Sequence, residues 1–272
     1  AARYLLWYLT GTPSFYAWQQ SQTRSFVTLR RTQALDWCAM LYWIMKHIVV
    51  GPYVKAVYRA WVRGIENVPA TGPVIIASNH LSVLDSVFMP LEVDRKVTFL
   101  AKSEYFTGSG FKGFITKVFM TGIGQIPIDR SGGKASEASL NTALQVLAGG
   151  GVLAIYPEGT RSPDGKLYRG RTGVARMILE SGAPVIPMVM VDTEKAMPIG
   201  SKLPKVHRVG MVFGEPLDFT RYVGMESDRF ALRAVTDEIM YELAKLGGQE
   251  YVDVYASTVK TPRADSALPK AS

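Results

Sequence analysis

A histidine and an aspartate lie five positions apart, shortly after the apolar run 74–77 of the sequence. This places His80 and Asp85 at the carboxyl edge of a predicted strand, where α/β proteins tend to bind ligands. Positions five apart on one helix lie roughly 140° from each other. The two side chains therefore meet only if the helix begins near Ser82, with Asp85 third in a capping box. The aspartate then orients the imidazole for proton transfer; the alternative is a helix cap beside a structural histidine.

A second polar cluster follows the apolar run 152–155. Gly159 lets a backbone approach a ligand closely, and Thr160 offers a hydroxyl and an amide. Arg161 can bind two phosphate oxygens at once. Glu158 can hold that arginine or bind a substrate hydroxyl. The alternative is a turn with an internal ion pair.

A third cluster, Gly122 to Arg130, has a Gly-rich approach to a strand and ends in an Asp-Arg pair, which makes Arg130 a second candidate phosphate ligand. Several other cations lie near it in the sequence. The alternative is a solvated basic face, the ordinary fate of scattered lysines. These cations are Lys102, Lys112, Lys117, Lys166, Arg169, Arg171 and Arg176.

The formal net charge of +8 predicts an anionic partner, such as nucleic acid, anionic lipid or a phosphorylated substrate. Residues 1–60 hold seven basic residues, one acidic residue and twelve aromatic residues. This mixture suits a helix lying in the headgroup region of an anionic bilayer, although the aromatic residues can also pack on the core. Their concentration near the N-terminus, rather than among cations on a sheet face, argues against nucleic acid.

A dedicated metal site is not expected from the histidine and cysteine content. The single cysteine, Cys38, excludes an internal disulfide and a cysteine-based zinc or iron–sulfur site. The three histidines show no metal-binding spacing.

Short apolar runs alternate with segments of helical periodicity, which predicts a single α/β domain with a mostly parallel sheet flanked by helices. A helix is expected from about 40 to 62, interrupted at Gly51-Pro52. We divide the chain into a membrane-binding helical segment 1–62, a catalytic domain 63–258 and a loose tail 259–272. Residues 1–39 are either a non-native extension or part of the membrane segment. The predicted strands are 74–76, 97–100, 125–128, 152–155, 185–189 and 209–213, and the predicted helical stripes are 140–147, 174–178 and 232–246.

Taken in order, these motifs resemble the four sequence blocks of the glycerolipid acyltransferases. The resemblance is strongest to the bacterial 1-acyl-sn-glycerol-3-phosphate (lysophosphatidic acid) acyltransferases, and it extends from about Met40 to Tyr255. The blocks are Asn79-His80-x4-Asp85, Gln125-x-Pro127-Ile128-Asp129-Arg130, Pro157-Glu158-Gly159-Thr160-Arg161-Ser162 and Val185-Ile186-Pro187.

The resemblance implies that His80 is a general base, oriented by Asp85, for attack of a glycerol hydroxyl on the thioester of acyl-CoA or an acylated carrier protein. The product would be phosphatidic acid, and no metal, other cofactor or acyl-enzyme would be required. Alternative acceptors are glycerol-3-phosphate and a glycolipid, and the non-enzymatic alternative is an anionic-membrane or nucleic-acid binding protein. Residues 185–187 are expected to pack in the core. The residues implied to bind the acceptor are Arg130, Glu158, Gly159, Thr160, Arg161 and Lys102.

These implications also give the basic, aromatic N-terminal segment a purpose. Lysophosphatidate and phosphatidate reside in the bilayer, so an enzyme attached to one leaflet can take them without extracting them fully. The expected location is therefore peripheral or monotopic on the cytoplasmic face of the cell membrane.

Overall fold

The computed structural model describes residues 40–102, 106–122, 124–128 and 134–260. The expectations for residues 1–39, for Arg130 and for the tail beyond residue 260 lie outside these residues. The backbone of Lys102 is described, and its side chain is not.

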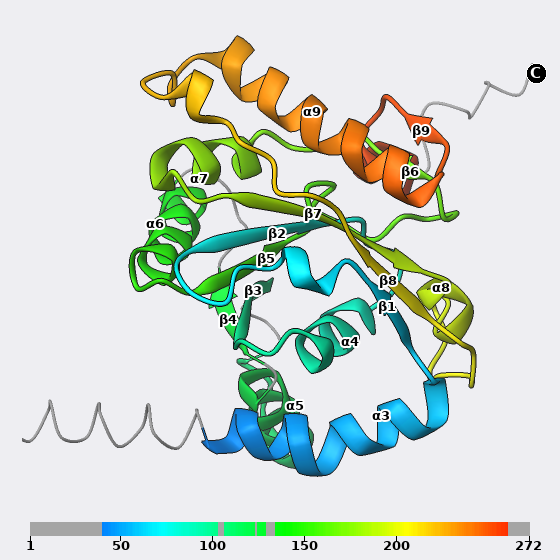
Figure 1. Cartoon of the computed structure of the whole chain (residues 1–272). Coiled ribbons are helices and arrows are strands. Elements are labelled where there is room, and N and C mark those ends of the chain that lie inside the picture. The colour runs from blue at the N-terminus through cyan, green and yellow to red at the C-terminus, as the bar shows by residue number, and fades with distance from the viewer. Residues whose placement is uncertain (1–39, 103–105, 123, 129–133, 261–272) are drawn as a thin grey trace, which may run out of the picture.

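A seven-stranded sheet forms the centre of the molecule, in the order β1-β8-β7-β2-β5-β3-β4 (Figure 1). All neighbours are parallel except β7 and β8. The prediction of an α/β fold with a mostly parallel sheet is thus confirmed, and all six predicted strands are present. The strands are β1 (Trp61–Arg63), β2 (Val74–Ser78), β3 (Val97–Lys102), β4 (Gln125–Ile128), β5 (Val152–Ile155), β7 (Val185–Val191) and β8 (Gly210–Phe213).

Helices cover both faces of this sheet, which explains why its central strands are apolar throughout (Figure 1). One face packs against α6 (Lys134–Ala148), α7 (Gly173–Ser181) and α9 (Arg229–Gly247), and these three helices contain the predicted stripes. The other face packs against α3 (Val50–Tyr58) and α4 (Asp85–Glu92). The remaining elements are η2 (Ile65–Asn67), α5 (Gly110–Gly122), β6 (Leu167–Tyr168), α8 (Thr193–Ala196), η4 (Thr220–Tyr222), β9 (Tyr251–Val252) and α10 (Ala256–Lys260), with β6 and β9 paired in a small second sheet.

The N-terminal helix runs from Met40 to Tyr58 without the expected interruption at Gly51-Pro52. Its middle, η1 (Met45–Val49), is a π-helical turn that directly precedes α3. Proline lacks a backbone donor and its ring clashes with the preceding turn of a regular helix, and the wider π turn relieves both problems. A Cβ on Gly51 would lie 1.9 Å from the Lys46 carbonyl oxygen, so glycine is required there.

The same helix ends earlier than predicted. Arg59 has a left-handed backbone (φ 45°), and the chain then forms the edge strand β1 rather than continuing as helix to residue 62. Buried Val54 and Tyr58 join the core beside α4. None of the helices in the described part of the chain combines the length and apolar character needed to cross a membrane.

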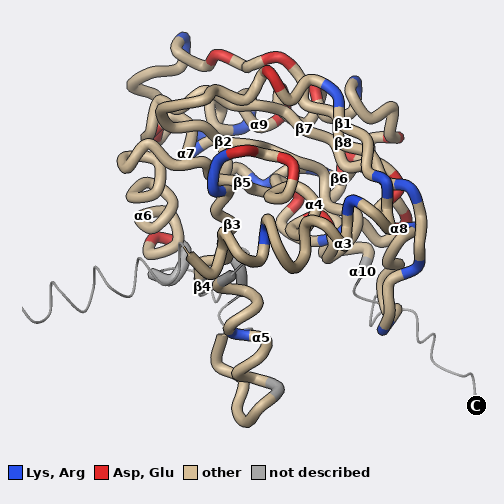
Figure 2. The backbone as a smooth tube through the Cα atoms, turned by 60° about the horizontal axis from the view of Figure 1, so that its bottom comes forward, with Lys and Arg blue, Asp and Glu red and all other residues tan. Residues whose placement is uncertain are grey.

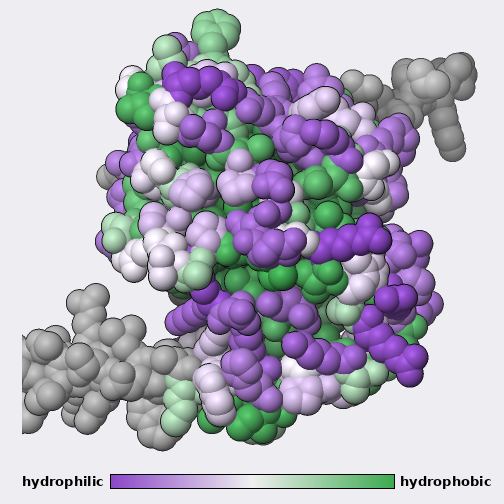
Figure 3. Space-filling view, viewed as in Figure 1, coloured by the Kyte–Doolittle hydropathy of each residue, from purple (hydrophilic) through white to green (hydrophobic). Residues whose placement is uncertain are grey.

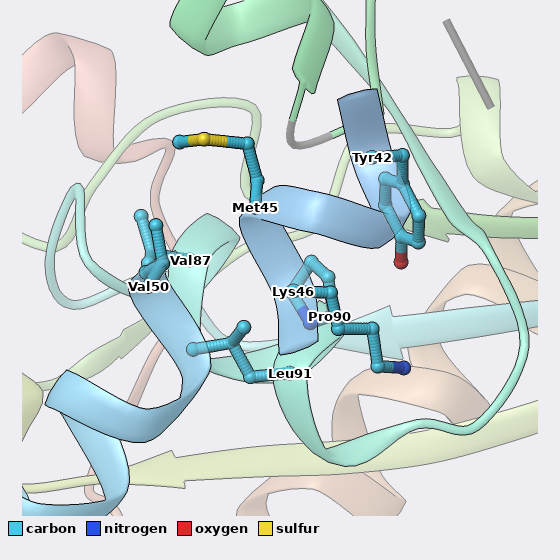
Figure 4. Close-up of a pocket in the computed structure, with 7 residues that line it drawn as sticks. All are labelled: Tyr42, Met45, Lys46, Val50, Val87, Pro90 and Leu91. Atoms are coloured by element: carbon cyan, nitrogen blue, oxygen red, sulfur yellow. The ribbon is translucent and has the colours of Figure 1, made fainter. Parts of the chain in front are cut away.

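Lys46 is buried between this N-terminal helix and α4, beside a small apolar pocket (Figure 4). Its ammonium group donates a hydrogen bond to the Val93 carbonyl at the end of α4. Burial lowers the pKa of Lys46, and nearby Asp94 opposes that effect. The pocket, of about 10 Å³, is lined by Tyr42, Met45, Lys46, Val50, Val87, Pro90 and Leu91.

We expect the Lys46→Met variant to have a different pH dependence of stability from the wild type. A lysine whose pKa is lowered on folding binds fewer protons in the folded state, so the cost of burying its charge falls as the pH rises towards 10.5, the ordinary pKa of lysine. The free energy of unfolding of the wild type, relative to Lys46→Met, should therefore increase between pH 7 and pH 10. Urea unfolding at each pH measures this difference. Lys55→Met, which alters an exposed lysine, is the control, and parallel curves for wild type and Lys46→Met would contradict the expectation.

Candidate active site

The loop after β2 is held in place by Asn79, which is fully buried. Its side-chain oxygen accepts a hydrogen bond from the Met190 amide (2.8 Å), and its side-chain nitrogen donates to the Met190 carbonyl (3.1 Å). Asn79 thereby continues the pairing of β2 with β7 by one residue beyond the strand. The next residue, His80, leaves the sheet at its carboxyl edge.

His80 and Asp85 meet as expected from their spacing. The Nδ1 atom of His80 lies 2.8 Å from Oδ2 of Asp85. The Asp85 side chain is fully buried, whereas 16% of the His80 side chain is exposed. Nδ1 faces the carboxylate, so Nε2 is the nitrogen that remains for a proton from a substrate.

The predicted capping box is formed only in part: Asp85 bonds to the Ser82 amide, but the Ser82 hydroxyl bonds to Leu84 and the helix begins at Asp85 rather than near Ser82. The bonds to Asp85 explain how residues five apart come together. Oδ2 of Asp85 also accepts hydrogen bonds from the Ser82 amide (2.9 Å) and the Leu81 amide (2.8 Å). The Ser82 hydroxyl accepts a bond from the Leu84 amide and donates one to the Met197 carbonyl. Regular helix begins at Asp85 itself, so His80 lies in the loop that turns back over the helix start.

Thr193 is a site residue that the sequence did not reveal. It lies at the start of α8, just beyond β7, and its hydroxyl donates a 2.6 Å hydrogen bond to Oδ1 of Asp85. Both residues are fully buried. Oδ1 and Oδ2 together accept four hydrogen bonds, which stabilise the negative charge on this carboxylate. The available signal was position alone, because Thr193 follows a strand adjacent to the one that precedes His80.

The Thr193→Val variant should lose activity through misorientation of Asp85. Valine has nearly the same shape but no hydroxyl, so a buried carboxylate oxygen loses its donor at a cost of about 1–3 kcal/mol. We expect kcat to fall about tenfold, with KM little changed, and Thr193→Ser to restore it. Steady-state kinetics with urea unfolding tests this; loss of activity in Thr193→Ser as well would show that the hydrogen bond is not the cause.

Tyr156 stacks against one face of the His80 ring. The two rings stack with centroids 3.8 Å apart and an interplanar angle of 8°. The Tyr156 hydroxyl lies 2.9 Å from that of Ser86, which belongs to α4. Burial, with a contribution from the charge on Asp85, raises the pKa of Tyr156 well above its usual range. The phenol therefore stays protonated at neutral pH and acts as a wall for the imidazole.

Glu158 connects the second motif to the first. It is 1% exposed, and its carboxylate accepts hydrogen bonds from the backbone amides of His80 (3.2 Å) and Tyr168 (3.0 Å). The Ser162 amide donates to the His80 carbonyl (2.7 Å). These bonds place the loop 156–162 beside the histidine and make Glu158 a positioning residue for it.

The rest of this loop lies at the surface of the site. Gly159 is exposed and has φ +74°, a conformation that favours glycine, and the Arg171 side chain lies 3.0 Å from where a Cβ would be. Thr160 and Arg161 are half-buried. The loop thus holds Glu158 and Ser162 against the His80 backbone, with Gly159, Thr160 and Arg161 between them in the sequence. The β7 residues 185–187 are buried, which confirms their expected packing role.

The described residues at this site do not include a set of metal ligands. In the portion of the molecule covered by the structure, no group of three histidine, cysteine, aspartate or glutamate side chains could hold a metal ion. The oriented imidazole of His80 can transfer a proton, and it lies next to a loop that carries an arginine.

A family model described as Acyltransferase matches residues 59–191, the part of the chain that contains His80, Asp85 and the 156–162 loop. Over these residues the chain is similar to members of the Acyltransferase family. The matched region contains six of the seven strands of the sheet in full. It also contains the site residues described above, except Thr193.

Relatives of this chain include a 1-acyl-sn-glycerol-3-phosphate acyltransferase of Bacillus subtilis, which is 27% identical over 66% of this chain and 84% of that protein. The chloroplastic enzymes BAT2 of Brassica napus and LPAT1 of Arabidopsis thaliana are 29% and 30% identical over 53% of this chain. The chain spans only 41% and 39% of their respective lengths.

A solved structure shows the same fold. The crystal structure of the 1-acyl-sn-glycerophosphate (LPA) acyltransferase PlsC from Thermotoga maritima superposes with a TM-score of 0.56 and 23% sequence identity. The match covers 82% of this chain and 88% of that chain. The central sheet and its helices are therefore an architecture shared with that enzyme.

Proposed function

We propose that the protein transfers a fatty acyl chain from a thioester to the free hydroxyl of 1-acyl-sn-glycerol-3-phosphate, forming phosphatidic acid. The observation that carries the proposal is the 2.8 Å contact between His80 Nδ1 and the buried Asp85 carboxylate. That contact leaves Nε2 on the partly exposed side of the ring. The relatives named above are 1-acyl-sn-glycerol-3-phosphate acyltransferases, which supports this choice of acceptor.

The reaction needs one base and no covalent enzyme intermediate. Nε2 of His80 accepts the proton of the acceptor hydroxyl as its oxygen bonds to the thioester carbonyl carbon. The Asp85 carboxylate stabilises the imidazolium cation that forms. The tetrahedral intermediate then collapses by breaking the carbon–sulfur bond, and the imidazolium returns the proton to the departing thiolate. The products are an ester and a thiol, and His80 is neutral again.

The acceptor's phosphate binds at the loop that follows β5. Arg161 and Thr160 offer a guanidinium group, a hydroxyl and an amide within the segment that Glu158 and Ser162 fasten to His80. Arg130 and Lys102 are proposed as additional phosphate ligands. The donor is acyl-CoA or an acylated carrier protein.

The enzyme acts on the cytoplasmic face of an anionic membrane, where both lipids reside. Helix 40–58 exposes large apolar side chains beside its packed face, and these rings and branched chains suit the headgroup region. They are Met40, Trp43, Ile48, Val49 and Tyr53, each at least 44% exposed. Residues 1–62 are proposed as the attachment segment, 63–258 as the catalytic domain and 259–272 as the tail.

A thiol-release assay tests the proposed function. The full chain is mixed with palmitoyl-CoA alone, with added lysophosphatidate or with added glycerol-3-phosphate, and the acylated product is identified by mass spectrometry. We expect thiol release that depends on lysophosphatidate, with phosphatidate as product. A preference for glycerol-3-phosphate would reassign the acceptor, and thiol release independent of any acceptor would contradict the proposal.

A further inference from the structure

Helix α5 carries an apolar stripe that the rest of the described protein leaves uncovered. Four large side chains point away from the core, and the most exposed of them, Phe111, is 80% exposed. At 100° per residue, these four positions fall within an arc of about 100° on one side of the helix. They are Phe111 (80%), Phe114 (62%), Ile115 (50%) and Val118 (36%).

The placement of α5 brings this stripe towards the end of the molecule where the N-terminal helix lies. Figure 1 shows both elements at the same end, and Figure 2 shows α5 projecting from the body of the protein. The chain just beyond α5 lies against the N-terminal helix, because a Cβ on Gly124 would lie 3.3 Å from the Tyr42 ring. Figure 3 shows apolar surface at this lowest part of the molecule.

The charges around the apolar stripe favour contact with an anionic surface. No aspartate or glutamate occurs between residues 105 and 128, whereas two lysines do. Lys117 is exposed, at about 120° from Phe111 and about 100° from Val118 on a helical projection. Cations beside a stripe of phenylalanine and branched aliphatic residues are the composition of a helix that lies in a bilayer interface.

We infer that α5 is a second membrane-docking element, which inserts Phe111 and Phe114 into the same leaflet as the exposed residues of helix 40–58. The inference rests on the membrane association in the proposed function and adds a separate point of contact to it. Two contacts on one end of the molecule fix the tilt of the protein on the membrane, which a single helix would not.

A fluorophore on α5 tests whether lipid covers it. In a Cys38→Ser background of the full chain, Phe114→Cys is labelled with an environment-sensitive dye, and Phe230→Cys is the matched control. Phe230 is 88% exposed at the start of α9, which covers the other face of the sheet. On addition of phosphatidylethanolamine–phosphatidylglycerol vesicles, we expect a blue shift in emission at position 114 and none at position 230.

A second measurement uses charge instead of a label. The Phe111→Asp/Phe114→Asp variant should have a vesicle partition coefficient lower by about tenfold or more, because two apolar rings no longer enter the interface. Phe230→Asp should partition like the wild type. Activity of both variants towards a short-chain lysophosphatidate dissolved as monomers should equal that of the wild type.

The possible outcomes distinguish failure of this inference from failure of membrane association and from failure of the proposed function. If residues 1–39 or a second copy of the chain cover position 114, the dye there will already be blue-shifted before vesicles are added. That result would overturn the inference. Vesicle binding without any response at position 114 would also overturn it, while leaving helix 40–58 as the attachment. Failure of the wild type to bind vesicles would refute membrane association itself, and failure to acylate monomeric lysophosphatidate would refute the proposed function independently.

Discussion

The His80→Ala variant is expected to lose about 10³-fold in kcat/KM for lysophosphatidate-dependent thiol release. Alanine removes the imidazole that we propose accepts the hydroxyl proton at Nε2, and a positioned general base contributes about 10²–10⁴-fold. The loss should appear in kcat rather than in KM, because the imidazole acts on the transition state. Steady-state kinetics with palmitoyl-CoA measure both values.

The controls for this variant address folding and the choice of histidine. His80→Ala also removes the stack on Tyr156, so circular dichroism and urea unfolding must show that the variant remains folded. His207→Ala alters a histidine whose side chain is 39% exposed and which contacts Asp192. It should retain nearly full activity. A folded His80→Ala protein with wild-type turnover would refute the mechanism.

Asp85→Asn should cost about 10²- to 10³-fold in kcat while destabilising the fold by only about 1 kcal/mol. The asparagine oxygen can occupy the Oδ2 position and accept from His80 and the two backbone amides. Its NH2 group then faces Thr193, whose hydroxyl can rotate and accept a hydrogen bond. The hydrogen-bond geometry survives, but the negative charge that stabilises the imidazolium is gone.

Two further variants separate charge from geometry. Asp85→Ala leaves the donors without an acceptor, so it should lower the free energy of unfolding by several kcal/mol as well as activity. Asp85→Asn combined with Thr193→Val buries an amide group that has no acceptor, and it should be less stable than either single variant. Equal activity of Asp85→Asn and the wild type would show that the carboxylate charge is dispensable.

The strands and the His80–Asp85 pair could be predicted because local sequence determines them. A strand buried on both faces must be apolar throughout, as Val74 to Ala77 and Val152 to Ile155 are. The capping box is also local, since it joins Ser82 and Asp85 within one turn. These features can be recognised without knowing the path of the chain.

The parts that were missed depend on contacts between distant residues. Strand β1 has three residues at the sheet edge and lacks a buried pattern. The continuous N-terminal helix depends on a π turn that no periodicity shows. Thr193 and Glu158 acquire their roles only when β7 and β5 lie on either side of β2. Sequence spacing carries no information about such neighbours.

The position of β2 between β5 and β7 has a consequence for how the chain acquires its activity. β2 is made early, yet both of its partners are synthesised much later, and Thr193 is separated from Asp85 by 108 residues. Pairings between such distant segments form slowly. A nascent chain therefore lacks the Thr193 hydrogen bond to Asp85 until β7 and the start of α8 have emerged from the ribosome and docked. Chains that end before residue 193 should therefore have a less firmly positioned Asp85 than the full chain.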